Sequence, residues 1–530
     1  AEYEQEANTL WYSDQKSEFT LQTPGELRGF AQLVNGGNDF SGRTVKLGKD
    51  IDVSNDTWTP IASTSKTPFK GTFDGAGKKI TYQIVECSKT DMALFGYLDG
   101  AELKNLTAAG ENRSIANSKV GTAGLCISAT NSRITDCVNE VRVITANSNS
   151  AAVGGILASA TNSVIENCVN KAEITGKAIA AGIVGDTSGN TAGKCTYIRG
   201  CRNEGSITGS KTGGIVGNYA SSGVMTEPVV ENCRNLGAVT ASGMNVGGIA
   251  GSFTGWMRNC ENTAEIDGNG KSVIGGIVGY LSGSSSAEIR IEKCRNSGDV
   301  YGTPIAGGIA GKTNSIKNSK IQIVNCENTG NVQTKKTGGA TGASNGGIIG
   351  ESSFPTLAAQ TSAALYVQGC ISYAEENLQL HAVGKLYSNA NNLKSNPTRK
   401  YEAVYALAEE GEDLVYDGSE PLAVNADSFR KSTMTIKLNK AGNENFWGYD
   451  AKAKYPLFGK FAEYPIMELT IKPFTEADAE KYQIELVSEG KSLTLDGSGN
   501  EKSTEMTRDF KAVLNIQDKN DASKSAKVML

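Results

Sequence analysis

A Cys-x-Asn motif recurs through the middle of the chain and constrains its fold more than any other feature of the sequence. Seven copies follow one another, with successive cysteines 27 to 34 residues apart. The pairs are Cys137 with Asn139, Cys168 with Asn170, Cys201 with Asn203, Cys233 with Asn235, Cys260 with Asn262, Cys294 with Asn296, and Cys326 with Asn328. Cys370 and Ser372 resemble a degenerate copy, 44 residues after Cys326. A period of this length is typical of solenoids, propellers and related repeat architectures.

A second motif, an aliphatic block flanked by glycine, repeats with the same period. It occupies residues 154–158, 181–185, 213–217, 247–251, 275–279, 307–311 and 346–350. Glycine reaches 62 of 530 residues, about 12%, against a usual level of about 7%. Each repeat therefore holds three β-prone pieces: the Gly-Ile-Val block, the stretch entering the cysteine, and the stretch ending in Ile or Val. Pieces of this length suit strands and are too short for helices.

These repeats predict a parallel β-helix, in which three strands and three turns form one coil. Coils stack about 4.8 Å apart, so equivalent side chains form ladders. Cys and Asn two positions apart point to the same face, and we expect a buried cysteine column. The recurrent Asn is expected to adopt a left-handed turn and to bond to its copies above and below. A β-propeller is the alternative, although its blades are longer and usually richer in aromatic residues.

The flanking segments predict a domain order around these repeats. Residues 1–18 form a tail and residues 19–462 the β-helix, with an N-terminal cap and first coils (19–120), regular repeats (121–370), and irregular coils and a cap (371–462). Thr23 and Pro24 precede apolar residues at helical spacing, which predicts a short capping helix. Alternating segments in 463–530 predict a small β-sandwich-like domain. The chain stops at Leu530 within a strand-like run, which leaves open whether the protein continues.

Charge and hydropathy exclude several classes of function. The net charge is −5, whereas nucleic-acid binders and polybasic membrane-surface proteins need a basic face. No apolar run approaches the roughly 20 residues that span a bilayer. The chain opens with polar residues, as a mature secreted protein does, and does not show whether a signal segment or an anchor precedes it.

The 11 cysteines could be thiols, disulfides or metal ligands. In-register parallel strands aim their Cβ bonds in the same direction, which is poor geometry for a disulfide. Cys-x-x-Cys pairs, the usual zinc signature, do not occur. We therefore predict buried thiols and neither a metal nor a cofactor. A local disulfide between Cys195 and Cys201 stays open.

Acidic residues recur beside the ladder cysteines and raise the question of catalysis. They are Asp136, Glu166, Glu231, Glu261, Glu292 and Glu327, near Arg202, Arg234 and Arg295. Enzymes that cleave polysaccharides need acids clustered on one face, whereas these acids shift position between repeats. We predict a charged surface stripe, a structural role for the single histidine, His381, and no catalytic residue.

Aromatic residues near the glycine blocks are candidates for ligand contact. They are Tyr219, Phe253, Trp256, Tyr280 and Tyr301. Exposed rings can stack on sugars or contact protein partners. The alternative is that they cover apolar surface at the coil corners.

The repeats resemble GLUG-motif proteins, a repeat family of bacterial cell-surface and secreted proteins. The resemblance covers roughly residues 19–460 and is carried by the Gly-Gly-Ile-Val-Gly blocks, the Asn-Cys-x-Asn-x-Gly-x-Ile segments and Phe69-Lys70-Gly71-Thr72-Phe73-Asp74-Gly75. It implies a Bacteroides-type Gram-negative surface protein, often lipid-anchored. The motif occurs in adhesin-like proteins and as an accessory region of some surface peptidases.

Together these features predict a non-enzymatic, exported surface protein that is a monomer and does not bind nucleic acid. It would bind host glycans or matrix proteins along a rigid rod, where weak sites add through effective concentration. We expect any membrane association to go through an anchor outside this sequence. Two alternatives stay open: a polysaccharide-degrading β-helix enzyme (lyase or glycoside hydrolase), and a passive stalk for another domain.

Overall fold

The computed structural model describes most of the chain. The described residues are 6–87, 92–114, 121–145, 151–191, 193–221, 225–269, 272–283, 287–302, 304–315, 318–334, 344–354, 363–374, 381–388, 398–408, 423–471, 480–488, 491–495, 502–506 and 512–529. They divide into two compact units, the first taking in residues 1–401 and the second residues 424–530. The domain boundary predicted near residue 462 stays a prediction.

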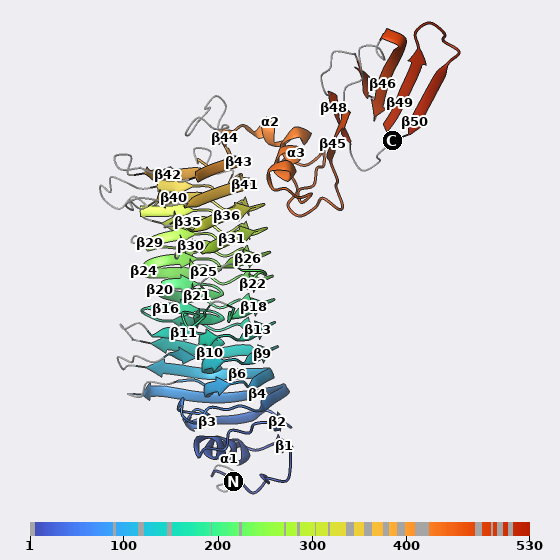
Figure 1. The fold of residues 1–530 in the computed structure, drawn as a ribbon. Coiled ribbons are helices and arrows are strands. Elements are labelled where there is room, and N and C mark those ends of the chain that lie inside the picture. The colour runs from blue at the N-terminus through green and yellow to red at the C-terminus, as the bar shows by residue number, and fades with distance from the viewer. Residues whose placement is uncertain are drawn as a thin grey trace. The chain divides into compact units, whose positions relative to one another are not determined.

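The first unit is a parallel β-helix, as the sequence predicts (Figure 1). The smaller of its two sheets has ten strands, which follow the glycine blocks and pair in parallel. Its strands are β5 (Phe95–Asp99), β8 (Cys126–Thr130), β12 (Leu157–Thr161), β17 (Val184–Asp186), β21 (Val216–Tyr219), β25 (Ala250–Phe253), β30 (Val278–Ser282), β35 (Ala310–Asn314), β40 (Ile349–Phe354) and β42 (Val383–Ser388).

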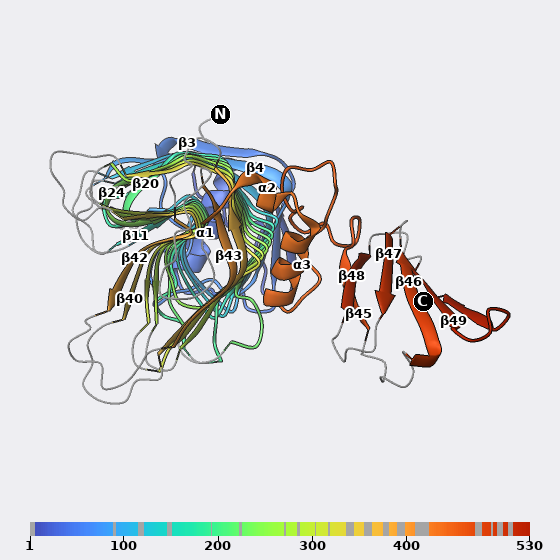
Figure 2. The same ribbon diagram turned by 90° about the horizontal axis from the view of Figure 1, so that it is seen from above.

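The larger sheet of the first unit consists of several stacks that follow one another around each coil (Figure 2). The strands entering the cysteines are β9 (Arg133–Thr135), β13 (Val164–Glu166), β18 (Tyr197–Arg199), β22 (Val230–Glu231), β26 (Trp256–Arg258), β31 (Glu288–Glu292), β36 (Lys320–Val324) and β41 (Ala364–Ser372). Those holding the recurrent asparagine are β10 (Val138–Thr145), β14 (Val169–Asn170), β19 (Arg202–Asn203), β23 (Arg234–Asn235), β27 (Glu261–Asn262), β32 (Arg295–Asn296) and β37 (Glu327–Asn328).

Two further stacks complete the coils. The first contains β15 (Ile174–Thr175), β20 (Ile207–Gly213), β24 (Val239–Gly247), β28 (Ile266–Asp267), β33 (Val300–Gly302) and β38 (Val332–Thr334). The second contains β7 (Thr122–Ala123), β11 (Ala152–Gly154), β16 (Ile179–Ala181), β29 (Ser272–Gly275), β34 (Pro304–Gly307) and β39 (Ser344–Gly346). The sequence predicts that the Gly-Ile-Val block is one strand, and this prediction is wrong, because the block forms a corner between two strands. In the block at residues 275–279, for example, one strand ends at Gly275 and the next begins at Val278, two residues after Gly276.

The recurrent asparagines form one continuous hydrogen-bonded ladder inside the coils. The side chains of all seven ladder asparagines, Asn139, Asn170, Asn203, Asn235, Asn262, Asn296 and Asn328, are fully buried. Asn235 is typical: its Nδ2 donates to Asn262 Oδ1 (2.7 Å) and to the Gly237 carbonyl (2.9 Å), and its Oδ1 accepts from Asn203 Nδ2 (2.7 Å). The ladder ends where Asn328 Nδ2 donates to Ser372 Oγ (3.0 Å). Buried amides are satisfied in this way without water, which confirms the predicted bonding between copies.

The left-handed turn next to the ladder is not formed by this asparagine, contrary to the prediction, but by the residue just before the ladder cysteine. These residues are Asp136, Asn167, Gly200, Asn232, Asn259, Lys293, Asn325 and Gly369, all with φ between 53° and 62°. Asn and Gly tolerate this conformation best. The turn brings the cysteine into the interior, and the ladder asparagine follows in a strand, where its amide lies in register with the next coil.

The second glycine of each block is required by close packing against the asparagine ladder. A Cβ atom on Gly214 would lie 2.3 Å from Asn235 Oδ1 and 2.3 Å from the Gly248 carbonyl oxygen. A Cβ atom on Gly276 would lie 2.3 Å from Asn296 Cγ. The two recurrent motifs of the sequence are therefore two sides of one contact, and the absence of a side chain at one position makes room for the amide at the other.

The ladder cysteines are buried free thiols, as predicted. All ten described cysteines are free and buried, and equivalent coils stack in register around them. Burial raises the pKa of the Cys137 and Cys201 thiols. Cys195 lies beside Ser221 Oγ (3.3 Å) and Met225 Sδ (3.9 Å), so the disulfide left open with Cys201 is not formed.

We expect the native protein to be nearly inert to Ellman's reagent at pH 8. Only the thiolate reacts, and burial both blocks access and disfavours that form. The ten described thiols should stay unlabelled before denaturation, and all 11 thiols of the chain should react after it. Rapid labelling of several thiols in the folded protein would contradict the buried column.

The helix α1 (Pro24–Asn35) covers the N-terminal end of the stack, as predicted (Figure 1). Thr23 accepts from the Glu26 backbone N–H and Glu26 reaches back to the Thr23 N–H, a reciprocal capping box. Phe30 is fully buried and its ring lies 5.0 Å from Phe40 and 5.6 Å from Phe73. The first strands are β1 (Glu18–Leu21), β2 (Thr44–Leu47), β3 (Ile51–Thr57), β4 (Thr72–Cys87) and β6 (Glu102–Ser114).

The second unit contains two short helices and two antiparallel sheets. The helices are α2 (Ala426–Phe429) and α3 (Ser432–Ala441), after β43 (Thr398–Leu407) and β44 (Ala423–Val424). Asn439 of α3 bonds to the backbone of Trp447, whose side chain is fully buried. One sheet pairs β45 (Met467–Ile471) with β48 (Lys502–Met506), and the other has the order β47 (Lys491–Leu495), β46 (Tyr482–Ser488), β49 (Ala512–Asp518), β50 (Ser525–Met529). The small all-β C-terminal region is confirmed.

Candidate binding face

Two columns of outward side chains follow the strands that enter the ladder cysteines. Four residues before the cysteine stand Tyr197, Trp256, Arg290 and Tyr366, here named the aromatic column. Two residues before it stand Glu166, Arg199, Glu231, Arg258 and Glu292, here named the charged column. Residues two apart on a strand share a face, and Met257 between them is fully buried. Both columns therefore lie on one outer face of the β-helix.

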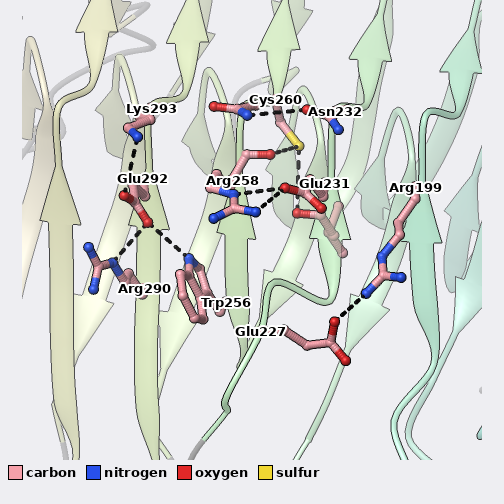
Figure 3. Close-up of polar contacts among 12 residues, drawn as sticks. Arg199, Glu227, Glu231, Asn232, Trp256, Arg258, Cys260, Arg290, Glu292 and Lys293 are labelled. Carbon is pink, nitrogen blue, oxygen red and sulfur yellow. Dashed lines mark hydrogen bonds and ion pairs between the residues drawn. The ribbon is translucent and has the colours of Figure 1, made fainter. Parts of the chain in front are cut away.

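The charged column alternates in sign from coil to coil. Glu166 is in register with Arg199, Arg199 with Glu231, Glu231 with Arg258, and Arg258 with Glu292. Arg258 Nε donates to Glu231 Oε1 at 2.7 Å, whereas Arg199 turns aside to pair with Glu227 at 2.8 Å (Figure 3). Opposite charges on neighbouring strands stabilise the stacking, whereas like charges would repel.

Trp256 is held on this face by a neighbour on its own strand and by two on the next coil. Its Nε1 donates to Glu292 Oε2 at 3.2 Å (Figure 3). The guanidinium carbons of Arg290 and Arg258 lie 5.2 Å and 5.7 Å from the ring centre. Glu292 is only 5% exposed and also pairs with Arg290 Nε at 3.1 Å. The indole ring is therefore fixed by a hydrogen bond and two cation–π contacts.

The same pairing of a ring with a cation recurs along the face. The Arg199 guanidinium lies 4.5 Å from the Tyr197 ring centre, and Lys320 Nζ lies 5.5 Å from that of Tyr366. Tyr197, Trp256 and Tyr366 are half-buried, so part of each side chain meets solvent. The face thus offers aromatic and cationic groups two to three coils apart. This combination suits a partner that carries hydroxyl or acidic groups together with apolar patches.

Of the five aromatic candidates, the structure brings only Trp256 onto this face. Tyr219 and Phe253 are each 1% exposed, and their rings pack 5.3 Å apart. The expectation that these two are exposed is wrong. Tyr219 follows the partly exposed Asn218 on its strand and so points inward, and Phe253 is in register with Tyr219 on the next coil. Tyr280 is half-buried on β30 of the ten-stranded sheet, and Tyr301 is half-buried on β33. Their role as ligand contacts stays a prediction.

The acidic stripe predicted from the sequence is partly buried. Glu292 and Glu327 are 5% and 1% exposed, so the prediction of surface acids is wrong for these two. Glu327 Oε1 accepts from the Tyr373 hydroxyl (2.7 Å) and Oε2 pairs with Arg295 Nε (2.7 Å). Burial raises the pKa of Glu327. Pairing with arginine explains how a carboxylate is tolerated at a buried position, since an unpaired buried charge is costly.

Sequence reasoning missed Tyr197, Tyr366 and the three arginines of this face. The signal was present: each of these residues stands two or four positions before a ladder cysteine. Aligning the repeats on the cysteine and reading the outward positions column by column would have found them. His381, predicted to be structural, contributes its backbone carbonyl to the coil stacking by accepting from the Gly347 N–H at 2.7 Å.

The described residues hold neither a cluster of metal-binding side chains nor a membrane-spanning helix. No group of three or more His, Cys, Asp or Glu side chains in the described ranges is placed to hold a metal ion. Within the same ranges, no helix has the length and apolar character to cross a membrane.

Comparison with known proteins gives one structural similarity. The chain matches no protein-family profile and no curated protein sequence. It is similar in structure to a solved protein from Bacteroides ovatus described as a putative immunoglobulin A1 protease. The two are 14% identical with a TM-score of 0.31, over 84% of this chain and 93% of the other. This is a similarity between β-solenoid proteins and assigns no activity to the chain.

Proposed function

We propose that this protein is a non-enzymatic adhesin of the GLUG-motif type, exported to the surface of a Gram-negative bacterium, where it binds host glycans or matrix proteins. The observation that carries the proposal is Trp256, fixed between Arg258 and Arg290 on an outer face that repeats the same ring-and-cation pairing at Tyr197 and Tyr366. Aromatic rings and arginine are the side chains most enriched at sites that carry binding energy.

The repeated face gives a mechanism for adhesion without a deep pocket. One such site contributes little by itself, since stacking of a ligand on one aromatic ring adds only about 0.5 to 1.5 kcal/mol beyond the area it buries. Several of them on one stack of strands can bind a polymeric ligand together, because the first contact raises the effective concentration for the next. A rigid parallel stack keeps the sites in fixed order and limits the entropy lost on binding.

Replacing Trp256 with alanine should weaken binding to immobilised mucin or fibronectin about tenfold, because an anchoring ring and its two cation–π contacts are lost. Binding is measured by surface plasmon resonance on the whole chain. Tyr464, an exposed aromatic of the second unit, provides the matched control, and Tyr464→Ala should bind as the unchanged protein does. Tyr280→Ala and Tyr301→Ala test the other two half-buried candidates in the same assay.

Two results would overturn the proposal. Equal binding by the Trp256→Ala and Tyr464→Ala variants would remove the face from the adhesion mechanism. Release of new reducing ends from mucin glycans or plant and host polysaccharides would show an enzyme instead of an adhesin. Antibodies raised against the purified chain should label intact cells of the source bacterium, and labelling only after lysis would contradict the surface location.

A further inference from the structure

A polar groove lies at a corner of the first coils, away from Trp256. Its volume is about 530 Å³. Thr44, Thr72, Glu102, Arg133 and Val164 line it and are in register across five successive coils. The groove therefore runs along the stack, and one step along it equals the coil spacing of about 4.8 Å.

The corner is shaped by left-handed residues, which turn the chain sharply between the two sheets. Gly100, Asn131 and Asn162 line the groove with φ of 68°, 51° and 48°. Asn162 Nδ2 donates to Asn131 Oδ1 at 2.7 Å, and Asn131 Nδ2 donates to Asp99 Oδ1 at 3.4 Å. Hydroxyl and amide groups thus form much of the lining, and these groups both donate and accept hydrogen bonds.

The charged groups of the groove are mostly cationic. Arg43, Lys70 and Arg133 line it, against the one lining carboxylate of Glu102. Glu102 already accepts from Lys104 Nζ at 2.9 Å. Arg43 and Lys70 pair at 3.6 Å and 3.5 Å with Asp14 and Asp39, and Arg133 pairs with Glu166. These three acids lie outside the groove lining. Exposed pairs of this kind are weak, on the order of 0 to 1 kcal/mol, so an anionic ligand can compete for the cations.

We propose that this groove binds a linear anionic polysaccharide that lies parallel to the stack. The coil spacing is close to the length of one sugar unit in an extended chain, so successive hydroxyls and acidic groups can meet equivalent positions on successive coils. Arginine and lysine recognise carboxylate and sulfate groups. The groove meets the adhesion face where Val164 is in register with Tyr197 and Arg133 pairs with Glu166. The proposal does not depend on the role proposed for Trp256.

The backbone of the groove favours a polysaccharide over an acidic peptide. An extended peptide gains most of its affinity by pairing with an open strand edge. Here the backbone N–H groups already donate along the stack: Thr72 to Arg43, Glu102 to Gly71 and Arg133 to Ala101, at 2.8 to 3.0 Å. Only side chains remain for a ligand, which suits a polymer that binds through its own substituents.

Isothermal titration of the whole chain tests the proposal with heparin (sulfated), polygalacturonate (carboxylated), dextran (neutral) and poly-glutamate (an acidic peptide). We expect heparin or polygalacturonate to bind and the affinity to fall as salt rises. Which of the two binds more tightly identifies sulfate or carboxylate as the preferred group. The double variant Lys70→Gln, Arg133→Gln should bind at least about tenfold more weakly. Both side chains are at least 40% exposed, so this variant should fold, which thermal unfolding verifies.

Lys171→Gln provides the matched control, because Lys171 is 46% exposed, pairs with Glu140 at 3.4 Å and does not line the groove. It should bind as the unchanged protein does. The proposal is overturned by equal binding of dextran, by tighter binding of poly-glutamate, or by an equal loss in the Lys171→Gln variant. Loss with Trp256→Ala but not with the groove variant would also overturn it.

Discussion

Replacing Asn235 with alanine should destabilise the coils around it by about 4 kcal/mol. The change removes three hydrogen bonds and leaves Asn203 Nδ2, Asn262 Oδ1 and the Gly237 carbonyl without their partner in a dry interior. An orphaned buried polar group costs about 1 to 3 kcal/mol. Asn235→Asp should be worse, because it keeps the shape, loses both N–H donors and buries a charge.

Amide hydrogen exchange, read coil by coil, is the measurement suited to this change. Stability in a solenoid is local, since each repeat contacts only its neighbours, and a single global value would average the effect away. We expect protection to fall around Asn203, Asn235 and Asn262 and to persist near α1. Asn314→Ala is the control, because Asn314 is half-buried on β35 and donates to the Tyr280 hydroxyl outside the ladder. An equal loss of exchange protection in both variants would show that a ladder asparagine stabilises the coils no more than a half-buried asparagine outside the ladder does.

Replacing Gly214 with alanine should destabilise the same region by about 3 kcal/mol, from the opposite side of the contact. The new methyl group would lie 2.3 Å from both Asn235 Oδ1 and the Gly248 carbonyl oxygen. Neither can move without breaking hydrogen bonds, and overpacking typically costs about 1 to 3 kcal/mol even where side chains can adjust. Thermal unfolding and hydrogen exchange on the whole chain measure the effect.

Gly36→Ala is the control for this substitution. Gly36 follows α1 with φ of −77°, and the nearest atom to its added Cβ would be the Gln32 carbonyl oxygen at 3.2 Å. It should change stability by less than about 1 kcal/mol. If Gly214→Ala unfolds at the same temperature as Gly36→Ala, the packing of the glycine block against the asparagine ladder does not limit stability.

The fold could be predicted because its cause is periodic. A cysteine, an asparagine and a glycine block return with each coil, and one period of about 32 residues admits few architectures. The conformation at the corners could not be read in the same way. The left-handed position is filled by Asp136, Asn167, Gly200 and Lys293 in different coils, so no single residue type marks it. The Ile and Val of the glycine block resemble a strand, although they form the bend between two strands.

The candidate face was harder to predict than the core because it depends on which residues face outward. Trp256 is held in place by Arg290 and Glu292, which lie more than 30 residues further along the chain. The register of the coils brings them next to Trp256. Tyr219 and Phe253 resembled surface aromatics, but strand alternation turns them inward. Composition near a motif does not determine orientation, whereas the parity of a residue within its strand does.

The continuity of the asparagine ladder allows the number of coils in the β-helix to change. Every coil between Asn139 and Asn328 offers the same donor to the next coil and the same acceptor to the previous one. A whole repeat can therefore be duplicated or deleted with the remaining amides still matched, each event changing the length by about 4.8 Å. Gain or loss of whole repeats would thus change how many coils the β-helix has and how many outward positions it displays, while leaving the interior chemistry unchanged.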